Sequence, residues 1–245
     1  MLLEGRDVTV AFGAFRAVDG ASVGVREGEV LGLIGPNGAG KSTFFNCLTG
    51  DLTPTQGSVH FAGQDVTRLP PEDRAALGIA RSFQVPLTFE GMSVLDNVMI
   101  GAFLRTAHTG EARERAGAVI ERVGLAPFAH ASARSLGTPG RKRLEIARAL
   151  ATEPKVLLLD EAMAGLTPTE VRQAIALVRA IHQSGITLVI VEHIMEVIVT
   201  LAERVVVFNQ GREIANGTPA EVTSEPQVIE AYLGKRAARA MRRGA

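Results

Sequence analysis

A glycine-rich segment constrains the fold of this chain more than any other feature. Residues 35–42 read GPNGAGKS and fit the pattern G-x-x-x-x-G-K-[ST]. The apolar run EVLGLI before this segment is typical of a buried strand, and KSTFFNCLTG after it is typical of a helix that ends at Gly50. Glycines allow successive backbone N–H groups to turn inward at the positive N-terminal end of the helix. The segment therefore predicts a strand–loop–helix unit that binds phosphate.

The chemistry of this loop extends to its side chains. We expect Lys41 to reach the β- and γ-phosphates of a nucleotide and the Ser42 hydroxyl to bind Mg²⁺. The residues predicted to contact ATP here are Gly35, Pro36, Asn37, Gly38, Ala39, Gly40, Lys41, Ser42 and Thr43.

Two further apolar runs end in residues that suit phosphate chemistry. VLLLDE delivers Asp160, which suits Mg²⁺ binding, and Glu161, which can polarise an attacking water; TLVIVEH ends at His193. Ligands of open parallel sheets bind outside the carboxyl ends of the strands. We therefore expect Gly35, Asp160, Glu161 and His193 to converge at one edge of a sheet.

The order of patterns along the chain indicates an α/β fold. Short alternating runs in the first thirty residues suggest antiparallel strands, and residues 93–150 are mainly helical in spacing. Strand and helix patterns then alternate, which indicates a parallel sheet covered by helices. IMEVIVTLAERV, residues 194–205, is predicted as a helix, and VVVFNQGREIANG as a hairpin turning at Gln210 and Gly211. We expect one domain over 1–245, with a helical lobe at about 85–150.

Composition excludes several classes of protein. Lys plus Arg and Asp plus Glu both total 26, so the chain lacks the basic excess of a nucleic-acid-binding protein. The single cysteine, Cys47, excludes a disulfide framework and is expected to be buried. No stretch reaches the ~18 apolar residues that a membrane-spanning helix needs, and no signal peptide is evident. The expectation is a soluble intracellular protein whose membrane role comes through a partner. The basic tail at 235–245 is either a solvated end or a contact for anionic lipid.

These motifs resemble the ABC ATPase family over essentially the whole chain. The resemblance implies an ABC-type phosphate-loop ATPase with an N-terminal antiparallel β subdomain, a mainly parallel sheet core and an inserted helical lobe. It assigns Gln84 in RSFQVP as the glutamine that touches Mg²⁺ and signals to a transmembrane partner, and His193 as the sensor of the γ-phosphate. It places Phe12 against the adenine base, with ordinary core packing as the alternative. Residues 164–167 occupy the D-loop position.

One motif departs from the family pattern. The signature segment, usually close to Leu-Ser-Gly-Gly-Gln, should contact the ATP of a partner subunit. Here it comprises Leu136, Gly137, Thr138, Pro139 and Gly140. Pro139 lacks a backbone N–H where such donors should face the γ-phosphate. Thr138 or Ser135 could supply a hydroxyl donor instead. The sequence therefore leaves open whether this segment binds the γ-phosphate.

A narrower resemblance is to the ATP-binding subunits of branched-chain amino-acid importers. It is carried by RSFQVPLTFEGMSVLDNVMIGA, RLEIARALA, LLLDEAMAGLTPTE and VIEAYLG. It implies ATP and Mg²⁺ as cofactors and a cytoplasmic location at the inner face of the membrane. The implied partners are permease subunits, a second ABC ATPase subunit in a homo- or heterodimer and, indirectly, a substrate-binding protein. The alternatives are the ATPase of lipopolysaccharide export, a soluble ABC-type switch, and a nucleotide-binding regulator that does not hydrolyse ATP. The presence of Glu161 argues against this last alternative.

Overall fold

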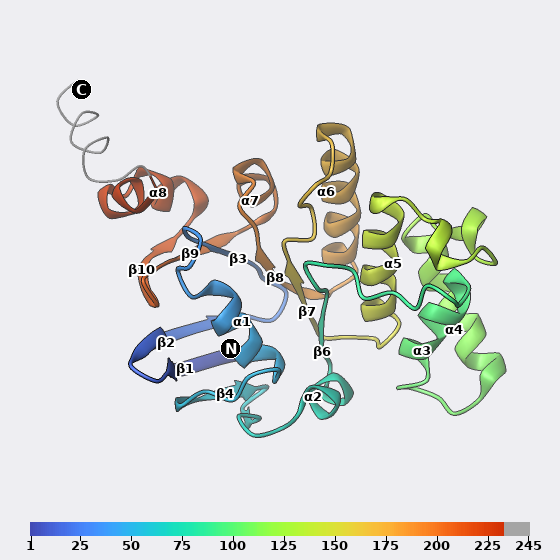
Figure 1. The fold of residues 1–245 in the computed structure, drawn as a ribbon, viewed down its shortest axis with the longest axis horizontal. Helices are drawn as coiled ribbons and strands as arrows, with labels where there is room; N and C mark the ends of the chain where they lie inside the picture. The colour runs from blue at the N-terminus through green and yellow to red at the C-terminus, as the bar shows by residue number, and fades with distance from the viewer. Residues whose placement is uncertain (233–245) are drawn as a thin grey trace. The chain divides into compact units, whose positions relative to one another are not determined.

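The computed structural model describes residues 1–232, so the predicted basic tail lies outside the described residues (Figure 1). The chain divides into two compact units. The first combines Met1–Pro71 with the chain from Thr187 onward, and the second comprises Glu72–Ile186. Each is built around its own strands.

An antiparallel sheet forms the N-terminal part of the first unit. Its strands are β1 (Leu3–Phe12), β2 (Phe15–Val25), β4 (Gln56–Phe61) and β5 (Gln64–Asp65), in the order β2-β1-β4-β5. β1 and β2 pair as a hairpin with Phe12 opposite Phe15. The antiparallel strands expected in the first thirty residues are therefore confirmed.

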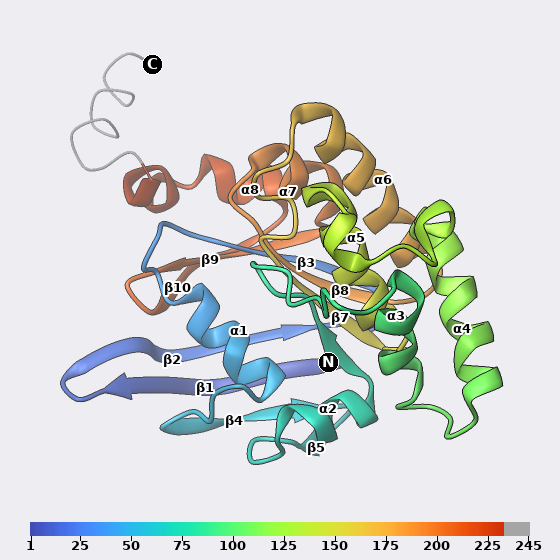
Figure 2. The same cartoon turned by 45° about the vertical axis from the view of Figure 1, so that its right-hand side comes forward.

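A second group of strands in the first unit is mostly parallel. β3 (Val30–Ile34) pairs in parallel with β8 (Thr187–Val191) and with β9 (Arg204–Asn209). β10 (Arg212–Gly217) closes the antiparallel hairpin with β9 at the predicted turn. The helix α1 (Lys41–Thr49) lies between β3 and the antiparallel sheet (Figure 2). It ends at Gly50, whose φ of 89° is the left-handed conformation expected there.

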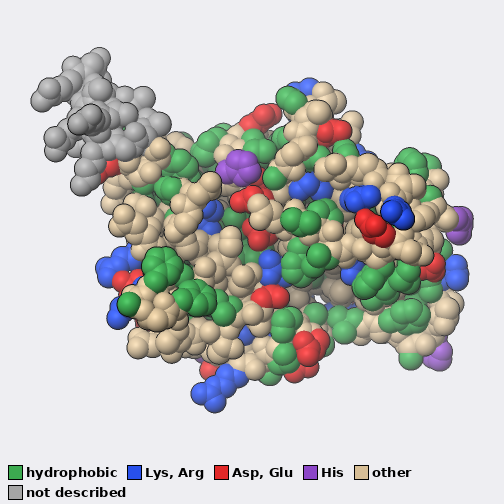
Figure 3. Space-filling view, in the orientation of Figure 1, with side chains coloured by type: hydrophobic (Ala, Val, Ile, Leu, Met, Phe, Trp, Pro, Cys, Tyr) green, Lys and Arg blue, Asp and Glu red, His purple; other side chains and the backbone are tan. Residues whose placement is uncertain are grey.

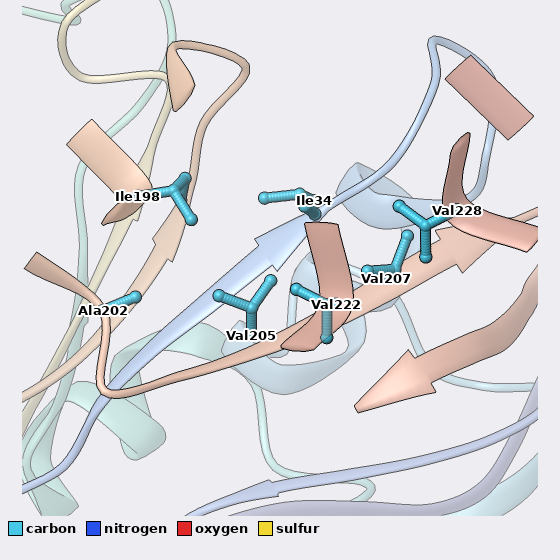
Figure 4. Packing of buried hydrophobic residues seen from close by; sticks show 7 residues of the cluster. All are labelled: Ile34, Ile198, Ala202, Val205, Val207, Val222 and Val228. Carbon is cyan, nitrogen blue, oxygen red and sulfur yellow. The ribbon is translucent and has the colours of Figure 1, made fainter. Parts of the chain in front are cut away.

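Aliphatic side chains hold the outer helices of the first unit on these strands. α7 (Met195–Leu201) and α8 (Pro219–Ser224) contribute to a buried cluster around Ile34 (Figure 4). Its members are Ile34, Ile198, Ala202, Val205, Val207, Val222 and Val228. The β-branched residues of β9 suit a pleated, buried surface. The cluster thus fixes the end of β3, from which the phosphate loop departs.

The second unit combines two parallel strands with most of the helices. β6 (Ile79–Arg81) pairs with β7 (Val156–Asp160), and α2 (Pro71–Leu77) begins at the unit boundary. The helices that follow β6 are α3 (Val94–Ala102), α4 (Thr109–Arg122), α5 (Thr138–Leu150) and α6 (Pro168–Gln183), with 3₁₀ turns at Ala126–Phe128 and Ala133–Ser135. α6 starts with a capping box between Thr167 and Glu170.

The α/β fold class with one antiparallel and one parallel-rich group of strands is confirmed. The helix predicted over 194–205 is wrong at its end, because α7 stops at Leu201 and Arg204 already begins β9. Ala202 is extended, with φ −79° and ψ 133°, and the valines that follow favour a strand. The sequence does not predict α2, β5 or β6, since all three are short and their patterns are weak. Cys47 is buried as expected.

Candidate functional site

The phosphate loop leaves β3 at Ile34 and enters α1 at Lys41. The Lys41 ammonium donates hydrogen bonds to the carbonyl oxygens of Gly35, at 2.7 Å, and Pro36, at 3.0 Å. Lys41 is only 8% exposed. The loop therefore wraps around its own lysine, and the cation is held at the start of the helix, where an anion would be attracted.

Two loop glycines are required by close packing as well as by conformation. A Cβ on Gly35 would lie 2.2 Å from the carbonyl oxygen of Phe208, and one on Gly40 would lie 2.3 Å from that of Ala17. Gly38 differs, since its φ of 77° is left-handed but nothing lies near its Cβ position. The loop is thus pressed against β9 on one side and β2 on the other.

His193 lies at the same edge of the first unit as the phosphate loop. β8 runs parallel to β3 with Val191 opposite Leu33, so the two strands end together. His193 follows Val191 by two residues and is exposed. The structure therefore brings Gly35 and His193 to neighbouring strand ends, as the sequence predicts.

Phe12 projects from the end of β1 and is 58% exposed. An aromatic ring that belonged to the core would be buried, as Phe44 is at 0% exposure. The core-packing alternative is therefore not supported, and the ring is free to stack on a flat ligand.

The acidic residues and the predicted glutamine lie together in the second unit. Asp160 ends β7, is 7% exposed, and lies 3.5 Å from the Arg81 guanidinium. The Gln84 amide donates a 2.6 Å hydrogen bond to the Glu161 carboxylate. Lys142 donates to the Glu161 carbonyl oxygen at 3.2 Å. Glu161 has a φ of 45°, a conformation that few non-glycine residues adopt. The predicted water-activating carboxylate and the predicted signalling glutamine are therefore in direct contact.

The signature segment coincides with the start of α5. Leu136 is buried and extended, Gly137 is the N-cap, and Thr138, Pro139 and Gly140 form the first turn of the helix. Gly137 and Thr138 are exposed. No side chain caps this helix start.

The donors predicted for Mg²⁺ are the oxygens of Ser42, Gln84 and Asp160. Within residues 1–232, no group of three or more His, Cys, Asp or Glu side chains is arranged to hold a metal by itself. A few protein oxygens completed by substrate phosphates and water are the usual donor set for Mg²⁺. The hydroxyl of Ser42 in the first unit and the side-chain oxygens of Gln84 and Asp160 in the second are donors of this kind.

Sequence reasoning missed two sets of residues near these groups. Glu145 and Arg148 of α5 contact the backbone that follows Gln84. Tyr232 lies against the phosphate loop: burial raises the pKa of its hydroxyl, and a backbone hydrogen bond from Gly35 opposes the shift. In the sequence, the segment VIEAYLG, which contains Tyr232, carries only the family resemblance.

Comparison with known proteins gives consistent matches. A family model described as ABC transporter matches residues 18–164, and one described as branched-chain amino acid ATP-binding cassette transporter matches residues 212–238. The high-affinity branched-chain amino acid transport ATP-binding protein LivG of Salmonella typhimurium is 38% identical and covers 96% of this chain and 98% of its own length. BraF of Pseudomonas aeruginosa, which carries the same description, is 37% identical with the same coverage.

Solved structures agree with these matches. A nucleotide-free ATP-binding cassette from an ABC transporter superposes with a TM-score of 0.87 at 32% identity, covering 96% of this chain and 99% of its own. A dimeric cassette bound to ADP and phosphate has a TM-score of 0.80 at 25% identity and covers 89% and 98%. Among the helices that the structure describes, none is long and apolar enough to cross a membrane.

Proposed function

Since the chain belongs to the family of ABC transporter ATP-binding subunits, we propose that it hydrolyses ATP to power an importer of branched-chain or related amino acids. The observation that carries the choice of substrate is the match to branched-chain amino-acid transport subunits over nearly the whole chain, including residues 212–238. These relatives favour the importer over the lipopolysaccharide exporter that the sequence left open.

The phosphate loop binds the phosphates of ATP. In this structure the Lys41 ammonium donates hydrogen bonds to the carbonyl oxygens of Gly35 and Pro36. On nucleotide binding it exchanges these acceptors for β- and γ-phosphate oxygens, which bear full charge and bind an ammonium more strongly. The exposed ring of Phe12 stacks on adenine, and His193 senses the γ-phosphate.

Ser42, Gln84 and Asp160 would supply oxygen ligands to Mg²⁺, and the ion would supply positive charge to offset the charge of the phosphates. Asp160 is suited to this role because burial and Arg81 at 3.5 Å keep its carboxylate in one place.

Glu161 acts as the general base that orients and deprotonates the attacking water. Its carboxylate receives a hydrogen bond from Gln84, and its backbone carbonyl receives one from Lys142. The bond from Lys142 is made to a backbone whose conformation is otherwise unfavourable at a non-glycine residue. The backbone and the carboxylate of Glu161 are thus each bound by a different segment of the second unit.

The subunit works as part of a larger assembly. Apolar side chains are exposed on the second unit, in the segment before α3 and at α3 itself, and Figure 3 shows hydrophobic side chains gathered around α3. They include Val85, Leu87, Phe89, Ile100, Phe103 and Leu104. A surface of this kind suits docking to a transmembrane permease subunit, which would hold the chain at the inner face of the membrane. A second ATP-binding subunit, identical or different, and a substrate-binding protein complete the system.

Reconstitution tests this proposal. The chain is assembled in lipid vesicles with its permease subunits and binding protein, and uptake of labelled leucine is followed with MgATP in the compartment that holds the chain. We expect uptake that depends on ATP and that disappears when the chain carries Lys41→Ala. ATP hydrolysis that leucine, isoleucine and valine all fail to stimulate, with no uptake, would refute the choice of substrate.

A further inference from the structure

The segment that carries Gln84 lacks regular secondary structure, yet its place relative to α5 is closely defined. Residues 83–89 lie between β6 and α3 and belong to neither strand nor helix. Gln84, Val85 and Leu87 are exposed, so their own side chains contribute little packing. The backbone of this segment must therefore be held by other groups.

Glu145 of α5 binds this backbone on both sides of Gln84. Its carboxylate accepts a 3.1 Å hydrogen bond from the Leu87 N–H and a further backbone hydrogen bond from Phe83. Glu145 is only 5% exposed. Burial raises the pKa of this carboxyl, while Arg148 and the two backbone donors oppose the shift. An apolar side chain of similar size would avoid the cost of desolvating a charge, so packing alone does not explain a glutamate here.

Arg148, one turn further along α5, holds the same segment. Its guanidinium lies 3.5 Å from the Glu145 carboxylate and donates to the carbonyl oxygen of Leu87. It also lies over the ring of Phe89, 4.8 Å from the centroid. Both backbone polar groups of Leu87 are therefore bound by one ion pair. At the far end of the segment, the Asn97 amide of α3 binds the N–H and the carbonyl oxygen of Phe89.

We propose that Glu145 and Arg148 are positioning residues that hold the backbone around Gln84 so that its amide reaches the Glu161 carboxylate at 2.6 Å. The inference rests on the proposed roles of Gln84 and Glu161 in hydrolysis.

A double-mutant cycle tests this proposal in the full-length chain with MgATP. The variants are Glu145→Ala, Gln84→Ala and the double variant, and the measurements are kcat, KM and melting temperature. Glu145→Gln keeps one oxygen acceptor without the charge and serves where the alanine variant does not fold. Arg105→Met is the control, because Arg105 donates to the backbone carbonyls of Ala75, Ala76 and Thr152 in the same unit, away from this segment.

If Glu145 positions Gln84, Glu145→Ala should lower kcat roughly tenfold or more while KM for ATP stays nearly unchanged. A misplaced Gln84 slows the chemical step more than it weakens binding. Glu145→Gln should recover part of that loss. In the Gln84→Ala background, Glu145→Ala should cost little more, because the group that it positions is already absent.

Three results overturn the proposal. If the losses simply multiply in the double variant, or if Arg105→Met lowers kcat as much as Glu145→Ala, Glu145 acts only through stability. If Gln84→Ala itself leaves kcat unchanged, the proposed role of Gln84 fails, and the positioning inference fails with it.

Discussion

The exposed ring of Phe12 allows the adenine contact to be tested without a large change in stability. A loss of ATP affinity on its removal can then be assigned to binding and not to folding. The ring ends β1, is 58% exposed, and pairs across the hairpin with Phe15, which is 64% exposed. Replacing an exposed side chain usually changes the free energy of unfolding by no more than about 0.5 kcal/mol. Stacking of an aromatic side chain on a nucleic-acid base is worth about 1–3 kcal/mol, and we take the same scale for adenine here.

Phe12→Ala should therefore weaken ATP and ADP binding roughly 5- to 150-fold, the equilibrium equivalent of about 1–3 kcal/mol. Inorganic triphosphate lacks the base, so its affinity should change much less. Calorimetric titration of the full chain with ATP and with triphosphate measures both. Phe15→Ala is the matched control, since it removes an equally exposed ring from the same hairpin.

The outcomes separate clearly. Equal weakening of ATP and triphosphate, with a lowered melting temperature, would indicate a folding defect. Unchanged ATP affinity would show that Phe12 does not contact the base. A loss of ATP affinity in Phe15→Ala as large as that in Phe12→Ala would place the adenine contact on the hairpin as a whole and refute the assignment to Phe12.

Three further predictions follow from the described contacts. Lys41→Ala should nearly abolish ATP binding, because it removes the cation that faces the phosphates; unchanged affinity for a fluorescent ATP analogue would contradict the phosphate-loop assignment. Glu161→Gln should retain ATP binding but lower hydrolysis by at least ~10²-fold, the lower range for a general base, and turnover at the native rate would exclude Glu161 from that role. Burial acts to raise the pKa of Glu29, but the bonds from Arg204 and from the Arg26 N–H together outweigh it, so the pKa is held below its ordinary value of 4.5. The free energy of unfolding should therefore fall as the pH drops below about 4.5, and Glu29→Gln should flatten that part of the urea-denaturation profile against pH.

The parts of the fold that the sequence predicts well are those fixed by local chemistry. The loop at 35–42 and the helix that follows could be predicted because glycine conformation, a helix start and the Gly50 end are all encoded within a few residues. The hairpin at Gln210 and Gly211 is equally local. The end of α7 could not be predicted in this way. Its boundary depends on pairing between β9 and β3, and residues 202–205 alone fit a helical pattern as well as a strand.

The candidate site also contains some residues that a local sequence pattern predicts and others that it does not. The sequence predicts roles for Lys41, Asp160, Glu161 and His193 because each follows an apolar strand or opens a helix. Gln84 came only from family resemblance, since a lone glutamine in a loop carries no pattern. Glu145 and Arg148 escaped notice for a different reason. Their partners are the backbone groups of residues about sixty positions away, and no side-chain motif reports such a contact.

The departure at the signature segment has a physical explanation in the placement of Pro139. The proline occupies the second position of α5, where a backbone N–H has no partner within the helix. Proline is well tolerated there, so the helix forms as readily as it would with glycine. What changes is the number of donors that the helix start can offer to a phosphate. Gly140 is constrained separately, because a Cβ there would lie 3.2 Å from that of Leu136. Pro139 is therefore compatible with the start of the helix and removes one backbone donor, and both Thr138 and Ser135 are exposed and carry a hydroxyl able to compensate.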